Sequence, residues 1–180
     1  IFANMVDNDG TIMQIDTDNG VWNTGEWTHV AITNNGNTTA LDAIDFYING
    51  ALVSKNNVNS GVQTPMTNTA RTLNIGHEIG GARNVDGKMA DIRFYSVALS
   101  ANNVKEIYDD SKVIIPSNVS QTNLKLWLPL MEGAGVVAYD GSGNGNHCDI
   151  INDSDWLTGQ TGAPQLVEGY NRPMLFDGSN

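Results

Sequence analysis

The chain has 180 residues, and 40% of them are hydrophobic, which suits a globular fold with a core of its own. Its formal net charge of −11 would repel the phosphates of nucleic acids and anionic membrane surfaces, so we expect neither as a partner. No apolar run approaches the ~20 residues that span a bilayer, and Cys148, as the single cysteine, allows no disulfide within the chain.

The first third of the chain has the pattern of short strands. Residues 27–33 alternate apolar and polar side chains, as a half-buried strand does. Asn49-Gly50 stands between two β-rich runs and predicts a tight hairpin, because both residues tolerate a positive φ. Another hairpin turn is predicted at residues 7–10. The predicted strands are residues 1–6, 11–15, 27–33, 44–48 and 51–53.

The middle of the chain contains the one clear helix. Ser100 can cap the segment 101–110, which carries Val104, Ile107 and Tyr108 on one face. Gly-rich stretches later in the chain indicate loops and turns. The other elements predicted are a loop at residues 56–70, strands at residues 73–76, 88–95 and 124–130, and a linker at residues 112–122.

Several motifs give the chain a family resemblance. WTHVA, YING, GKMADIRFY and ALS, in this order, resemble the C-terminal half of a concanavalin-like, laminin-G type jelly roll. Residues 126–135, 140–146 and 176–178 resemble the N-terminal half of the same family. The resemblance implies an all-β fold, a concanavalin-like jelly-roll β-sandwich with one short helix.

The two halves occur in reversed order. We expect residues 1–111 to be the C-terminal half of one laminin-G-like domain, residues 112–122 a linker, and residues 123–180 the N-terminal half of a second domain. A single circularly permuted domain is the alternative, because the termini of such folds lie close together. Since Ile1 already lies in a strand-like run, we also expect the chain to be part of a longer polypeptide.

The resemblance implies a structural calcium ion. Related jelly rolls bind it through an Asp in the late Asp-x-Arg-x-Tyr strand, here Asp91, and through groups of the N-terminal segment. The matching loop offers Asp140, Ser142 and Asn144, and calcium takes roughly six to eight oxygen ligands. The alternative is that Asp140 caps a turn through its own backbone. If the halves belong to two domains, Asp91 and Asp140 cannot share an ion.

Exposed aromatic residues are candidates for sugar binding. Trp27 and Trp127 lie in alternating strands, so we expect them in the core. Other aromatics stand in polar, turn-rich segments, where a ring could stack on a pyranose beside hydrogen-bonding side chains. The predicted ligand-binding residues are Trp22, Trp156, Tyr170 and Arg172.

No catalytic residues are predicted. Glucanases with this fold carry Glu-x-Asp-x-x-Glu on one strand, and the chain has no such run. Residues 113–147 also resemble repeat units of large phage structural proteins. We therefore expect a non-catalytic binding or structural module, extracellular or on a virion surface, such as a tail fibre or capsid decoration. Its partners would be cell-surface glycans or receptors and other virion subunits, with homo-oligomers also considered. The alternatives are a purely architectural virion domain and a carbohydrate-binding accessory module of a secreted bacterial protein.

Overall fold

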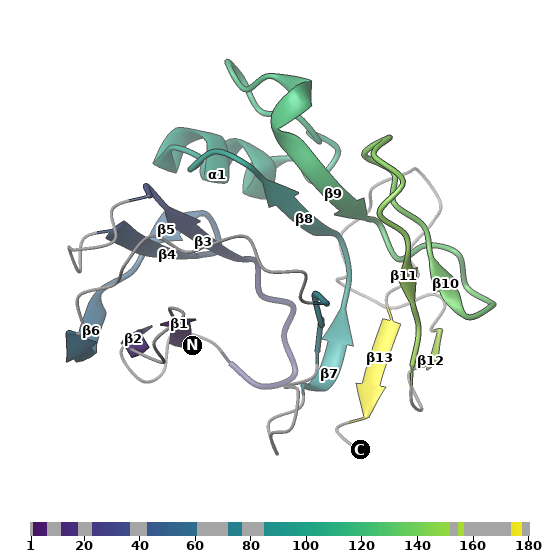
Figure 1. Ribbon diagram of the computed structural model, residues 1–180, viewed down its shortest axis with the longest axis horizontal. Helices are drawn as coiled ribbons and strands as arrows, with labels where there is room; N and C mark the ends of the chain where they lie inside the picture. Colours follow the sequence, from purple (N-terminus) through teal and green to yellow (C-terminus); the bar gives the residue numbers. More distant parts are fainter. Residues whose placement is uncertain are drawn as a thin grey trace. The chain divides into compact units, whose positions relative to one another are not determined.

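The computed structural model describes residues 2–6, 12–17, 23–36, 43–60, 72–76, 85–151, 155–156 and 174–177 (Figure 1). Within this part, short strands dominate and α1 is the single α-helix, so the predicted all-β class with one short helix is confirmed. The elements are β1 (Phe2–Val6), β2 (Ile12–Thr17), β3 (Val30–Asn34), β4 (Ile44–Ile48), β5 (Ala51–Leu52), β6 (Lys55–Ser60), β7 (Asp86–Met89), β8 (Ile92–Tyr95), α1 (Ala101–Asp109), the 3-10 turn η2 (Gln121–Asn123), β9 (Leu124–Leu128), β10 (Val137–Ala138), β11 (Cys148–Asp149), β12 (Asp155–Trp156) and β13 (Met174–Asp177).

The chain forms two compact units, and each is made of two separate segments. Unit 1 contains residues 1–70 and 97–119, whereas unit 2 contains residues 71–96 and 120–180. Unit 2 therefore combines part of the predicted C-terminal half with the predicted N-terminal half. The assignment of these halves to two domains or to one permuted domain stays a prediction.

Unit 1 has two antiparallel three-stranded sheets, ordered β1-β2-β6 and β3-β4-β5. The predicted Asn-Gly hairpin joins β4 to β5, with Asn49 at φ 49° and Gly50 at φ 75°. A Cβ on Gly50 would lie 2.8 Å from Cδ1 of Tyr108, so the turn also requires glycine for close packing. Residues 7–10, the other predicted turn, lie outside the described residues, but β1 and β2 on either side are paired.

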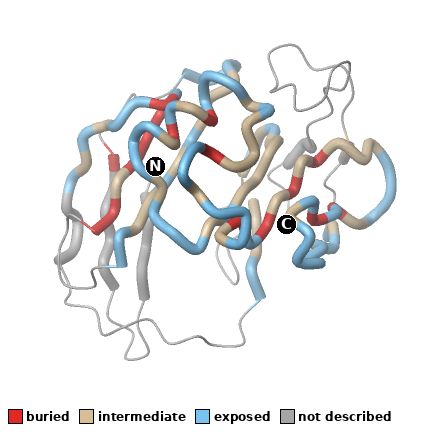
Figure 2. The backbone as a smooth tube through the Cα atoms, turned by 90° about the horizontal axis from the view of Figure 1, so that it is seen from above, coloured by how far each residue is buried: buried red, intermediate tan, exposed pale blue. Residues whose placement is uncertain are grey.

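The buried residues of unit 1 lie mainly on β4 and on one face of α1. Figure 2 colours the backbone by burial. Ile44 and Phe46 on β4 are at most 2% exposed, and Val104 and Ile107 on α1 are buried as predicted. Tyr108, predicted on the same face, is 44% exposed. Ser100 forms a capping box with Asn103, which confirms the predicted start of the helix. No described helix has the length and apolarity needed to cross a membrane.

The first part of the predicted linker is held against α1. Both Ser117 N and Ser117 Oγ donate to the Glu106 carboxylate, at 2.9 and 3.0 Å. Asn103 Nδ2 donates to Ser117 O at 2.9 Å, and Pro116 is fully buried. Residues 112–119 therefore form a fixed extension of unit 1.

Unit 2 contains the strand pairs that position the candidate site. Its sheets are β8-β9, β10-β11 and β12-β13-β7, all antiparallel. In β9, Leu124, Leu126 and Leu128 are buried and Lys125 is exposed, as the alternating sequence predicts. The central apolar cluster consists of Leu126, Leu128, Leu130 and Ala138, with Ile75, Met89, Ile92, Cys148, Ile150 and Trp156 packed against it.

Three predictions of secondary structure were wrong. Residues 88–95 do not form one strand, because Asp91 adopts a φ of 55° and separates β7 from β8. Residues 73–76 are irregular and end at Gly76, which has a φ of 80°. The predicted loop at residues 56–70 contains most of β6, a polar segment that is a strand because it pairs with β2.

Candidate functional site

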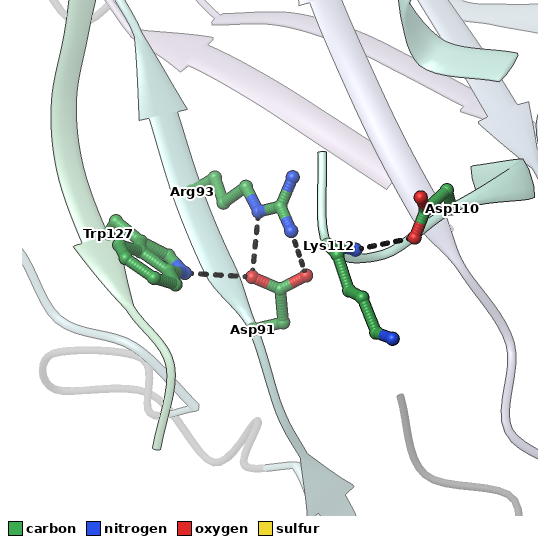
Figure 3. A network of polar contacts seen from close by, with 5 residues as sticks. All are labelled: Asp91, Arg93, Asp110, Lys112 and Trp127. Atoms are coloured by element: carbon green, nitrogen blue, oxygen red, sulfur yellow. Dashed lines mark hydrogen bonds and ion pairs between the residues drawn. The ribbon is translucent and has the colours of Figure 1, made fainter. Parts of the chain in front are cut away.

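Trp127 on β9 contacts both of the aspartates that were predicted to bind calcium. Figure 3 shows its contact with Asp91. Its indole Nε1 donates to Oδ1 of Asp91 at 3.0 Å, and its peptide N donates to Oδ1 of Asp140 at 3.0 Å. Its carbonyl oxygen accepts a hydrogen bond from Gly141 N at 2.7 Å. Trp127 also pairs with Arg93 in the register of β8 and β9. Pairing of these strands is therefore what joins the two acidic positions.

Asp91 forms a bidentate ion pair with Arg93. Arg93 Nε donates to Oδ1 and a terminal guanidinium nitrogen donates to Oδ2, both at 2.7 Å. The side chains of Arg93 and Asp91 are only 5% and 11% exposed. The left-handed backbone at Asp91, a conformation that Asp adopts more readily than most residues, places this carboxylate between β7 and β8. Together with Trp127 Nε1, three donors occupy its two oxygens.

Asp140 is held by main-chain and hydroxyl donors. Oδ1 accepts from Trp127 N and from Ser142 N, while Oδ2 accepts from Ser142 Oγ and from Asn146 N. The residue is 8% exposed. Burial by itself raises its pKa, but the hydrogen bonds from Trp127, Ser142 and Asn146 outweigh it and lower the pKa from 3.8 to about 2. Asp140 is therefore ionised at any ordinary pH.

The Gly-rich loop after Asp140 is fastened to β9. Asn144 Nδ2 donates to the carbonyl of Leu124 at 2.8 Å, and Asn146 Nδ2 donates to the carbonyl of Lys125 at 2.9 Å. A Cβ on Gly141 would lie 2.6 Å from the Trp127 ring, so only glycine allows this approach. The loop is a turn organised by the side chain of Asp140, which corresponds to the alternative that the sequence left open.

These contacts do not fit a calcium site. Both carboxylates are engaged by protein donors, and Ser142 Oγ and Asn144 Nδ2 donate to protein oxygens. Calcium requires oxygens with lone pairs that converge on one point. Within the described residues, no three side chains of His, Cys, Asp or Glu form a group that could hold a metal ion.

The predicted sugar-binding aromatics do not form a described site. Trp22, Tyr170 and Arg172 lie outside the described residues. Trp156 on β12 is half-buried, packs against the central cluster of unit 2, and donates from Nε1 to the carbonyl of Gly135 at 2.9 Å. Its ring therefore contributes to the core and to the anchoring of residue 135.

A different exposed surface lies on the hairpin formed by β10 and β11. Ala138 and Cys148 face the core, so residues one step away along either strand face outward. Tyr139 is 57% exposed, and the ring of His147 meets it edge-on with 5.3 Å between centroids. This face was not predicted from the sequence. We call this surface the outer hairpin face, and its residues are Val137, Tyr139, His147, Asp149 and Ile151.

Two ionisable side chains of unit 2, Cys148 and Tyr95, have raised pKa values. Burial raises the pKa of the Cys148 thiol, and the negative charges of Asp140 and Asp149 raise it further. Burial also raises the pKa of Tyr95, although Arg93 acts in the opposite direction. Both groups are therefore protonated, and unreactive, at neutral pH.

Comparison with known families agrees with this architecture. The family model of the concanavalin A-like lectin/glucanases superfamily matches residues 1–105, more than half of the chain. The chain belongs to this superfamily. Membership and the strand-rich structure confirm the predicted fold class, and domains of this laminin-G type are generally carbohydrate-binding or structural modules without catalysis. No curated protein and no solved structure matches the chain.

Proposed function

We propose that the chain is a non-catalytic glycan-binding module of the concanavalin A-like superfamily, and that the glycan binds to the outer hairpin face. The observation that carries this proposal is the pair formed by Tyr139 and His147, two rings in contact on an exposed strand surface. Sugar-binding sites commonly combine an aromatic platform with side chains that hydrogen-bond hydroxyls. Exposed aromatics scattered singly are common on proteins, so the pairing is the relevant feature.

The side chains of the outer hairpin face suit a neutral pyranose. The Tyr139 ring can stack on the apolar C–H face of the sugar. His147 Nδ1 accepts a hydrogen bond from Asp140 N at 3.0 Å, so the proton of a neutral imidazole lies on Nε2, which can donate to a hydroxyl. Asp149 is exposed and can accept hydrogen bonds from hydroxyls. Its charge, together with the net −11 of the chain, disfavours anionic sugars.

The platform is fixed before a ligand arrives. Glu132 Oε1 accepts a hydrogen bond from the peptide N of Tyr139 at 2.7 Å. The next peptide N, that of Asp140, holds the ring of His147. Fixing both aromatic residues through the main chain reduces the ordering cost of binding. A shallow, exposed face nevertheless buries little of its ligand, so we expect a Kd of roughly millimolar strength for one site.

We propose that the chain belongs to an extracellular or virion-surface protein that presents several such modules, the setting already expected from the sequence. Repetition would raise the avidity of individually weak sites. The pairing of β8 with β9 supports the version in which both halves of the chain form one permuted domain. A purely architectural role is the second candidate, and the burial of Trp156, the one described member of the predicted sugar-binding set, favours it.

The experiment is a glycan array followed by NMR titration of the full chain with the neutral oligosaccharide that gives the strongest signal. We expect shifts confined to residues 135–151, and about tenfold weaker binding by Tyr139→Ala, because the stacking contact is lost. Phe94→Leu is the matched control, since it removes a 42% exposed ring elsewhere in unit 2. An array without any bound glycan would support the architectural role.

A further inference from the structure

We infer that the guanidinium of Arg93 supplies the cation at the acidic position of Asp91, so that the folded module does not depend on calcium. The family resemblance implied a calcium ion at this position. The hydrogen bonds of Asp91 and Asp140 do not fit such an ion. The inference concerns the stability of unit 2 and is independent of whether the outer hairpin face binds glycans.

Asp91 is engaged on both carboxylate oxygens. They accept three hydrogen bonds, two from Arg93 at 2.7 Å and one from Trp127 at 3.0 Å. A calcium ion could bind both oxygens of this carboxylate only by displacing the guanidinium. Arg93 would then keep a positive charge in a position where its side chain is 5% exposed, next to a divalent cation. A buried charge that loses its carboxylate counter-ion is strongly destabilising.

The polar groups of the loop after β10 form hydrogen bonds within the protein and leave few oxygens for a metal ion. Asp140 accepts four hydrogen bonds from peptide N–H groups and a hydroxyl, all of which present positive hydrogens to its oxygens. Ser142 Oγ donates its hydrogen bond to Oδ2 of Asp140 at 2.9 Å. Asn144 points its amide nitrogen at the carbonyls of β9. Both oxygens of Asp140, the carboxylate that a calcium ion would need in this loop, are therefore already hydrogen-bonded.

The positive charge next to Asp91 is brought there by strand pairing. Arg93 stands directly opposite Trp127 in the β8-β9 register, so strand pairing delivers the guanidinium, the indole N–H and the carboxylate to one place. The counter-charge of Asp91 thus arrives as part of folding. In metal-supported modules the same stabilisation arrives with an ion, and chelators remove it.

The test is thermal unfolding of the full chain, in EDTA and in ~10 mM CaCl2, a concentration above the roughly millimolar Kd of weak extracellular calcium modules. We expect the two melting temperatures to agree within about 1 °C, because calcium does not bind at Asp91 or Asp140 in the folded state. Isothermal calorimetry with CaCl2 should show no saturable heat. A melting temperature raised by several degrees in calcium, or a saturable calcium isotherm, would overturn the inference.

Variants identify the source of the cation. We expect Arg93→Met to lower the melting temperature by roughly 10 °C, because it leaves the Asp91 carboxylate buried without its counter-charge, with only the Trp127 N–H as a donor. Arg93→Lys should lower the melting temperature less, since the charge remains but the bidentate contact with Asp91 is lost. Lys105→Met is the matched control, because it breaks an exposed ion pair with Asp109. An Arg93→Met melting temperature equal to that of the control would contradict the inference. If Arg93→Met does not fold, Arg93→Lys against the control decides.

Discussion

The two units of the chain are stabilised in different ways. Unit 1 buries an almost continuous apolar strand, β4, and many of its described polar contacts are exposed, such as the capping box of Ser100 and the ion pair of Lys105 with Asp109. Unit 2 buries a smaller apolar cluster and adds a partly buried polar network around Trp127. One chain of this superfamily can therefore combine a unit held mainly by an apolar core with a unit that adds a polar network. We expect the two units to respond differently to mutation and to pH.

The largest effect is expected from the apolar core of unit 1. Phe46 is 0% exposed, and Phe46→Ala should lower the free energy of unfolding by about 4 kcal/mol, through lost burial and the cavity left behind. Leu52→Ala on β5, where the side chain is 59% exposed, is the control and should cost less than about 1 kcal/mol. Urea titration measures both. Equal losses would mean that β4 does not carry the stability of unit 1.

The packing of the Asp140 loop against Trp127 gives the next effect. Gly141→Ala places a Cβ 2.6 Å from the indole ring and should cost about 2–3 kcal/mol, because the loop must shift. Gly87→Ala is the control, since its Cβ would meet only Val85 at 3.9 Å. The intrinsic fluorescence of Trp127 should change in the first variant. A Gly141→Ala chain as stable as Gly87→Ala would show that the loop is not held against the ring.

The pH dependence should separate the polar unit from the apolar one. The folded pKa of Asp140, about 2, lies below its ordinary value of 3.8. Its contribution of roughly 2 kcal/mol is therefore fully present above pH 4 and is lost as the pH falls toward 2. Urea midpoints measured from pH 5 to pH 2 should converge for the wild type and Asp140→Asn. A difference between them that stays constant over this range would contradict the assigned hydrogen bonds.

The smallest effect is expected at the surface of α1. Lys105 and Asp109 form an ion pair at 2.7 Å, but their side chains are 62% and 53% exposed. Lys105→Ala should therefore change the free energy of unfolding by less than about 0.5 kcal/mol, with even less change in high salt. A loss comparable to that of Gly141→Ala would mean that polar contacts matter as much in unit 1 as in unit 2.

Local patterns predicted most of the secondary structure. The Asn49-Gly50 hairpin, the helix capped at Ser100 and the alternation of β9 were all read correctly, because each depends on neighbours in the sequence. The break at Asp91 was missed, since nothing in GKMADIRFY reveals a left-handed residue. β6 was missed because its strand character comes from β2 and not from its own polar side chains.

The candidate site was less predictable. Sequence reasoning singled out Asp91 and Asp140, which do meet at Trp127, where both accept hydrogen bonds from the chain itself. The calcium ion assigned to them stays a prediction. It placed Trp127 in the core, yet the network depends on its indole N–H. The outer hairpin face was overlooked because the two strands that form it have only two residues each, too few for a visible alternation.

The strand pairing of unit 2 has a consequence for the order in which the protein is synthesised. The family match ends at residue 105, but β8 within it pairs with β9, and β7 pairs with β13. β13 leaves the ribosome about 90 residues after β7, so at roughly 5–20 residues per second β7 waits some seconds for its partner. During this interval its edge is open to other nascent chains. Molecular chaperones, or slow translation after α1, would therefore affect the yield of this protein more than its final stability.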